Sequence, residues 1–431
     1  MRIKMSLRLA GLLGLLLLAM AGCGRASTAT NTTKSVQLPR GETLYVLDGY
    51  AGTAATQRIL AFQPGKGTSA LLTLPVGVTS YDHTTLYAAS AAAGHTTIAV
   101  INTRTGGTLR SITLAGSYET TGPGYGASTI SPDGKWLALR QSGTTGGTTT
   151  IALLDTQAGR LANTVSLLGD FELDAISPDG QVLYLIENLH DVAHHYYVKA
   201  YDVASATLGD WVIVDKTEIE NPKMQGTPLT RQMAPDGSVA YTLYINAAQN
   251  SAFIHVLPLV GSANDARFAR CVDLPVGSAG SLLKYYTLAL APDGSHLYAT
   301  NAALGVSNVV DLHGPDVLSD NLTSTAHFTA AGDTALAWDF YGGAALAAGS
   351  GMLYVAGAHG IVALHTPDMQ MKDVYLAGGT FTGLALSGDG RTLYAVDPAN
   401  GIVPLNLATG KAGAALRGPA ATPWGVAWVA E

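Results

Sequence analysis

Short apolar segments alternate with polar turns along most of this chain. Segments such as residues 136–140 (WLALR) and 182–186 (VLYLI) have the length of a strand and are too short for most helices. Their apolar residues are consecutive in places rather than strictly alternating, which is typical of strands whose sheet is covered on both faces. The pattern therefore predicts an all-β fold with many short buried strands.

One version of this pattern recurs along the chain. A tight turn is followed by an apolar residue, and tyrosine usually comes next, as in TLYVLD, HLYAT and TLYAV. The first apolar residue after each turn occurs at eight places: Leu44, Leu86, Leu137, Leu183, Ala240, Leu297, Leu353 and Leu393. Their spacing of roughly 40 to 57 residues is close to the length of one four-stranded propeller blade.

The turn itself has a physical explanation. In Pro132-Asp133-Gly134, proline presets φ for the second position of a type I turn, aspartate suits the third, and glycine tolerates the left-handed conformation that often follows. The same triplet stands at 178–180, 235–237 and 292–294, and Asp389-Gly390 keeps its last two residues. Asp82-His83 and Gly349-Ser350 are eroded versions at the same offset.

The two ends of the chain indicate how the repeats close. The first unit begins at its second strand, whereas the C-terminal segment PWGVAWVAE resembles a first strand that lacks a second. Pairing of these ends would remove the exposed sheet edges. We therefore expect a β-propeller of four-stranded antiparallel blades, closed by the C-terminal strand, with eight blades favoured and seven as the alternative.

The repeat resembles a known family. The order SPDG, then LYV or LYAT, then a D-x-x-x-G turn is similar to the bacterial YVTN-type propeller repeats, which are related in pattern to WD-repeat-like propellers with a Pro-Asp-Gly turn. The likeness covers nearly all of residues 41–431. It implies a propeller in an exported or surface protein. Such propellers include binding proteins, lactonases and cyclases, so the fold alone does not assign a function.

The N-terminus has the pattern of a lipoprotein signal peptide. A basic start (Arg2, Lys4, Arg8) precedes an apolar run that ends in Met20-Ala21-Gly22-Cys23, similar to the bacterial lipobox. We expect residues 1–22 to be removed, Cys23 to carry lipid, 23–40 to form a flexible Ser/Thr-rich linker and 41–431 to form a single propeller domain. The protein would then be exported and anchored by lipid to the outer face of a bacterial membrane.

Composition narrows the possible partners. The formal charge of −7 and the lack of basic runs argue against nucleic acid. Besides Cys23 the chain has one other cysteine, Cys271, so no disulfide is expected if Cys23 is lipidated. Cys271 is interpreted as a small buried residue in a strand. We expect a monomer.

Candidate binding residues lie in three long connections. All three are expected on the face where the innermost strands begin, and connections of this length are often functional. The candidates are His190, Asp191, His194 and His195 in the first, Glu218 and Arg231 in the second, and Trp338, Phe340 and Tyr341 in the third. Asp174, Arg231 and Lys284 are also placed to line the central channel.

Each candidate has a less specific interpretation. The histidines are of a type that binds zinc or copper. They lack, however, the helical turn that would put His190 and His194 on one face. A solvated polar loop is therefore favoured, and neither a metal nor a cofactor is expected. The aromatic residues either contact a ligand or plug the ring. No nucleophile elbow, zinc-protease motif or phosphate loop occurs.

Three functions stay open at this stage. The first is a membrane-tethered extracytoplasmic scaffold that binds a protein, glycan or small molecule through its loop face, without catalysis. The second is a lactonase- or cyclase-like enzyme at the central channel. The third is a structural protein of the cell envelope.

Overall fold

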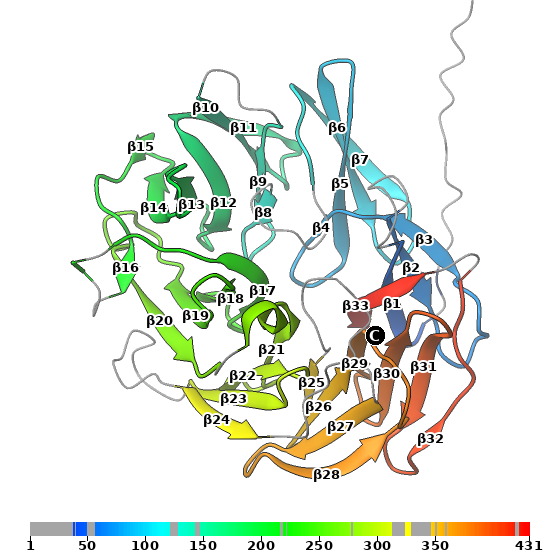
Figure 1. Cartoon of the computed structure of the whole chain (residues 1–431). Helices are drawn as coiled ribbons and strands as arrows, with labels where there is room; N and C mark the ends of the chain where they lie inside the picture. Colours follow the sequence, from blue (N-terminus) through cyan, green and yellow to red (C-terminus); the bar gives the residue numbers. More distant parts are fainter. Residues whose placement is uncertain are drawn as a thin grey trace, which may run out of the picture. The chain divides into compact units, whose positions relative to one another are not determined.

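Eight β-sheets, antiparallel except for one short strand, make up the described part of the chain (Figure 1). The computed structural model describes residues 38, 40–49, 57–120, 128–142, 147–215, 219–220, 222–276, 279–312, 324–328, 346–349, 351–357, 360–418 and 422–431, with the backbone alone for 324–328, 346–348 and 357. Residues 1–22, Cys23 and most of the predicted linker lie outside this description. All strands belong to one compact unit, residues 35–431.

Each sheet is one blade, and we number the blades in chain order. The strands of the first four blades are, from the first to the fourth position, β33 (Pro423–Ala430), β1 (Thr43–Asp48), β2 (Arg58–Phe62) and β3 (Leu72–Pro75); β4 (Val78–Thr79), β5 (Thr85–Ala92), β6 (His95–Asn102) and β7 (Thr108–Ala115); β8 (Ser128–Ile130), β9 (Trp136–Arg140), β10 (Thr148–Asp155) and β11 (Arg160–Leu168); and β12 (Asp170–Ile176), β13 (Val182–Asn188), β14 (Tyr196–Asp202) and β15 (Thr207–Leu208).

The other four blades follow the same order. Their strands are β17 (Thr227–Met233), β18 (Val239–Asn246), β19 (Ser251–Pro258) and β20 (Phe268–Leu274); β21 (Tyr286–Leu290), β22 (His296–Asn301), β23 (Val306–Asp311) and β24 (Ser324–Phe328); β25 (Leu346–Gly349), β26 (Met352–Gly357), β27 (Gly360–His365) and β28 (Gln370–Tyr375); and β29 (Gly383–Leu386), β30 (Thr392–Asp397), β31 (Gly401–Asn406) and β32 (Lys411–Ala412).

Two features depart from the minimal repeat. Blade 5 has a fifth strand, β16 (Val214–Asp215), which comes from the connection after blade 4 and pairs in parallel with the outer edge of β20. A short 3₁₀ helix, η2 (Gly280–Tyr285), precedes β21. Within the described residues, no helix is long and apolar enough to cross a membrane.

The recurring Ser-Pro-Asp-Gly turn serves the fold. Ser131 Oγ donates a hydrogen bond to Asp133 Oδ1 at 2.5 Å and accepts one from the Trp136 backbone N–H at 2.9 Å. Gly134 takes a φ of 70°, which favours glycine. The serine–aspartate bond recurs between Ser177 and Asp179 and between Ser387 and Asp389. The motif therefore joins the first and second strands of a blade, and in these turns the serine holds one oxygen of the aspartate.

The hydrophobic core lies between blades. Eight clusters of buried apolar side chains occur among the described residues, and each joins one pair of neighbouring blades. In the cluster between blades 8 and 1, for example, Tyr394 and Val396 pack with Leu44 and Phe62. Because blade 8 packs on blade 1 as the other neighbours pack on each other, the sheets form a closed ring.

The C-terminal strand closes this ring, as the two chain ends predicted. β33 pairs antiparallel with β1, with Leu44 opposite Val429 and Tyr45 opposite Trp428. Figure 1 shows β33 beside β1, although they come from opposite ends of the chain. The prediction of an all-β propeller with eight blades is confirmed.

Candidate functional site

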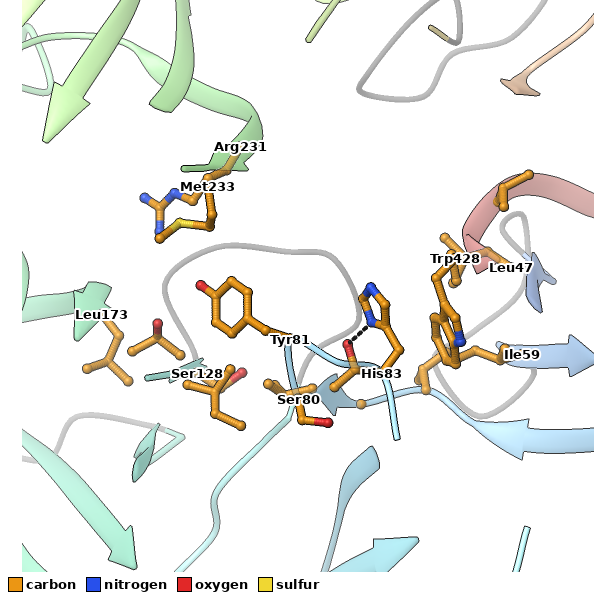
Figure 2. A pocket seen from close by; sticks show the side chains of 18 of the residues that line it. Leu47, Ile59, Ser80, Tyr81, His83, Ser128, Leu173, Arg231, Met233 and Trp428 are labelled. Atoms are coloured by element: carbon orange, nitrogen blue, oxygen red, sulfur yellow. Dashed lines mark hydrogen bonds between the residues drawn. The ribbon is translucent and has the colours of Figure 1, made fainter. Parts of the chain in front are cut away.

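The first strands of five consecutive blades line a cavity of about 420 Å³ near the axis of the ring (Figure 2). These strands are β33, β4, β8, β12 and β17, from blades 1 to 5. The wall combines apolar side chains, such as Ile130, Leu173 and Met233, with a few polar ones. A cavity of this size and composition is typical of sites for small organic molecules.

Asp174 and Arg231 form a buried ion pair in the wall of this axial cavity. Arg231 Nη2 donates to Asp174 Oδ1, Nη1 donates to the Asp174 carbonyl oxygen at 2.5 Å, and Nε donates to Thr242 Oγ1 at 2.7 Å. The side chains of Arg231 and Asp174 are 14% and 2% exposed. Since the two charges neutralise each other, the pair fixes the wall without giving it a net charge.

A β-bulge places the aspartate of this pair. The register between β12 and β13 shifts between Leu173 and Ala175, so Asp174 is the extra residue of β12. A bulge re-aims the side chain of the inserted residue. It gives Asp174 the position from which its carboxylate meets Arg231 on the neighbouring blade.

A row of polar residues continues from Arg231 across blade 5. Thr242, His255 and Cys271 lie opposite one another in successive strands of the sheet. His255 is buried, and neither of its ring nitrogens has a hydrogen-bond partner among the described residues. Burial lowers the pKa of His255 to about 4, so the ring is neutral near pH 7. The row behind the cavity wall is polar but adds no further positive charge.

Two stacked rings, His83 and Trp428, belong to another part of the cavity wall, and Tyr45 stacks behind Trp428. Trp428 of β33 lies between Tyr45 and His83, with ring centroids 4.4 Å and 5.1 Å away. His83 belongs to the turn after β4, so this stack ties the closing strand to blade 2. Burial lowers the pKa of His83. Figure 2 shows the histidine ring between Tyr81 and Trp428.

The turn after β4 departs from the repeat at two positions. Tyr81 replaces the usual proline and His83 replaces the usual glycine. His83 keeps the left-handed backbone, with a φ of 54°, which costs about 1–2 kcal/mol for a residue other than glycine. Strain of this kind clusters at functional sites. In Figure 2 the Tyr81 ring projects into the cavity toward Leu173 and Arg231, which belong to blades 4 and 5.

The histidine candidates form a separate turn between β13 and β14. His195 Nδ1 lies 2.7 Å from Asp191 Oδ2, and its backbone N–H donates to Oδ1 at 3.0 Å. These bonds lower the pKa of Asp191 to about 2. His190 Nε2 lies 3.0 Å from Asp170 Oδ2. The two rings thus contact different carboxylates.

This turn contacts the second predicted insertion. Met224 and Tyr196 exchange two backbone hydrogen bonds of 3.0 Å, and Lys223 Nζ lies 3.9 Å from Asp191 Oδ2. The described parts of these two connections are therefore in contact. Neither the histidine turn nor residues 222–226 line the axial cavity.

The candidate residues therefore have different outcomes. Arg231 and Asp174 line the axial cavity. Lys284 lies in η2, and its Nζ is 5.2 Å from the centroid of the Tyr285 ring. Glu218, Trp338, Phe340 and Tyr341 lie outside the described residues. The sequence analysis did not propose Tyr81 and His83 as site residues. The signal that could have found them is that they replace the proline and the glycine of the repeated turn.

The cavity wall offers few polar side chains. Its one carboxylate and its one guanidinium, among the described lining residues, are engaged with each other. The remaining polar lining consists of Tyr81, His83 and small hydroxyl side chains. Such a wall offers hydrogen bonds and apolar contact to a neutral molecule.

The eight-bladed ring with its axial cavity defines a β-propeller protein, and several solved structures resemble it. AztD from Citrobacter koseri is 11% identical, with a TM-score of 0.52 over 89% of this chain and 96% of that one. The dihydro-heme d1 dehydrogenase NirN, solved in complex with DHE, is 15% identical, with a TM-score of 0.52 over 92% and 80%. A periplasmic gluconolactonase of Pseudomonas aeruginosa, PpgL, is 17% identical, with a TM-score of 0.45 over 90% and 99%.

At these identities the likeness shows the fold alone. No protein-family model and no curated protein matches the chain. The function must therefore be argued from the residues of the site.

Proposed function

We propose that this protein is a membrane-tethered, extracytoplasmic β-propeller of the YVTN-type, WD-repeat-like pattern that binds a small molecule in its axial cavity. The observation that carries the proposal is the cavity itself. It is about 420 Å³ in volume, and its two charged side chains neutralise each other. The strained turn that carries Tyr81 and His83 supports a binding role for this wall.

The membrane anchor rests on the sequence. Met20-Ala21-Gly22-Cys23 resembles a lipobox, and the Ser/Thr-rich residues after it have the composition of a flexible tether. Two or more acyl chains hold a protein stably on a membrane, whereas a single chain does not.

Substitution Cys23→Ser tests the anchor. The variant should appear in the soluble extracytoplasmic fraction, whereas the wild type should stay with the membrane and show acyl chains on Cys23 by mass spectrometry. Cys271→Ser is the matched control, because it should leave the protein on the membrane. Membrane retention of the Cys23→Ser variant would argue against lipid anchoring.

Filling the cavity tests the binding site. Ser128 lies in the wall, and Ser128→Phe should place a ring in the space that a ligand occupies. Benzyl alcohol, a neutral probe that fits the cavity, should give a saturation-transfer NMR signal with the wild type. We expect the signal to fall at least tenfold in the variant, because the cavity volume is lost.

Ser111→Phe is the control for this experiment. Ser111 is exposed on β7, and the same substitution there leaves the cavity unchanged. Equal signals from wild type and Ser128→Phe would place the probe elsewhere and contradict the proposed site.

A lactonase- or cyclase-like activity at the same cavity is the alternative. His83 at the wall is the observation in its favour, since an imidazole can transfer protons near neutral pH. The mutual neutralisation of Asp174 and Arg231 favours binding over catalysis. The contact between the histidine turn and residues 222–226 supports a further role of the loop face as a surface for a protein or glycan.

A further inference from the structure

A second cavity lies beside the axial one. It has a volume of about 630 Å³ and is lined by residues from blades 2 and 3, including the turns that follow β4 and β8. We call it the turn-face groove. Ser80 and Tyr81 line both the groove and the axial cavity, so they separate the two spaces.

Tyr81 is unusual for a residue at this place in the repeat. The corresponding residue is proline in four other turns: Pro132, Pro178, Pro235 and Pro292. A tyrosine is much larger, and Tyr81 is 41% exposed despite its position at the axis. The side chain is therefore not simply a core residue. Tyr81 lines both spaces and stands between them.

The groove has a different chemistry from the axial cavity. Its ionisable lining includes the carboxylates of Asp82 and Asp133 and the guanidinium of Arg110. Arg110 Nη1 donates to the Gln157 carbonyl oxygen at 2.8 Å, so part of the guanidinium is already engaged. The Thr84 hydroxyl lines the groove as well and donates to Asp82 Oδ2 at 2.9 Å, so part of that carboxylate is also engaged. The groove suits a group that donates hydrogen bonds, and two carboxylates disfavour an anion.

We infer that the axial cavity and the turn-face groove form one elongated binding site, divided by Tyr81, for a neutral amphiphilic molecule. The apolar part of the ligand lies in the axial cavity against Leu173, Ile130 and Met233. Its hydroxyl-bearing part lies in the groove beside Asp82 and Asp133. This inference rests on the proposed small-molecule function of the axial cavity.

Matched probes test the shape and the chemistry of the site. Monomeric n-hexyl β-D-glucoside carries both an apolar tail and a hydroxylated head, methyl β-D-glucoside carries the head alone, and hexanoate carries a tail with an anionic head. Titration calorimetry of the full-length wild type should give a Kd for hexyl glucoside at least tenfold lower than for either other probe, because only this probe fills both spaces.

Substitutions in the two spaces separate their contributions. Gln157 is exposed and lines the groove, so Gln157→Trp should fill the groove. The Kd for hexyl glucoside should rise about tenfold, while benzyl alcohol should bind in the axial cavity as before. Ser128→Phe should weaken the binding of both hexyl glucoside and benzyl alcohol. Gln370→Trp, at an exposed position on β28, is the control for a surface tryptophan and should change neither.

The outcomes distinguish this inference from the function on which it rests. If benzyl alcohol binds and responds to Ser128→Phe, but Gln157→Trp leaves hexyl glucoside unchanged, the shared site is wrong and the axial site stands. If hexanoate binds more tightly than hexyl glucoside, the ligand class is wrong. If no probe binds the wild type, the proposed function falls as well.

Discussion

Deletion of residues 423–431 is expected to abolish cooperative folding of the propeller. The deletion removes β33, which pairs with β1 along the whole of that strand. It also removes Trp428, the central ring of the stack with Tyr45 and His83. Blade 1 would keep three strands with an unpaired inner edge, and such an edge invites aggregation. Thermal denaturation followed by circular dichroism should show no sharp transition.

A peptide and a shorter deletion control this experiment. Removal of Glu431 alone takes away the hydrogen bond from Arg104 to its backbone oxygen but keeps all of β33, so it should leave a cooperative transition. A synthetic peptide of residues 422–431, added to the truncated protein, should restore part of the transition by supplying β33. A truncated protein that melts like the wild type would show that ring closure does not depend on this strand.

Arg231→Ala is expected to lower the free energy of unfolding by about 3–5 kcal/mol, because it leaves the buried Asp174 carboxylate without its partner. Three hydrogen bonds from the guanidinium are lost with it. Urea denaturation should show a lower midpoint with an unchanged slope, since the fold itself is kept. A loss in the same direction should appear in Asp174→Ala, which removes the carboxylate that accepts from Arg231 Nη2.

Two further variants test whether this loss of stability comes from the burial of the pair. Arg391 Nε lies 4.0 Å from Asp389 Oδ2, and both side chains are exposed, so Arg391→Ala should cost less than about 1 kcal/mol. The double variant Asp174→Leu with Arg231→Met should recover most of the lost stability, because it removes both buried charges together. A single Arg231→Ala variant as stable as Arg391→Ala would mean that the pair contributes little to folding.

The architecture could be predicted because the information that defines it is local and repeated. Pro-Asp-Gly turns mark where the first strand of a blade ends and the second begins, and the apolar residues that follow indicate which strand is buried. The mode of closure followed from comparing the two ends of the chain. The segment before Leu44 lacked a first strand, and PWGVAWVAE lacked a second.

The site was only partly predictable because its geometry depends on contacts between blades. Asp174 and Arg231 are 57 positions apart, and they meet because a single inserted residue bulges β12. A bulge has no clear sequence signal of its own. Asp82-His83 was interpreted as an eroded turn and Tyr81 was not singled out, since nothing in the sequence shows that this turn lies at the axis. β16 is only two residues long, which is too short for any periodic pattern.

β16 has a mechanical consequence for the ring. It leaves the connection after blade 4, pairs with β20 of blade 5, and anchors Asp215 against Arg270 Nη1 at 3.0 Å and the Cys271 backbone N–H at 2.6 Å. The chain leaving blade 4 thus adds a strand to blade 5 before the sheet of blade 5 begins. In the same way the chain leaving blade 8 adds β33 to blade 1. In a ring of eight these junctions are diametrically opposed. The ring therefore consists of two halves of four blades, and an added strand holds the junction at each end. The axial cavity crosses one of these junctions, the one between blades 4 and 5.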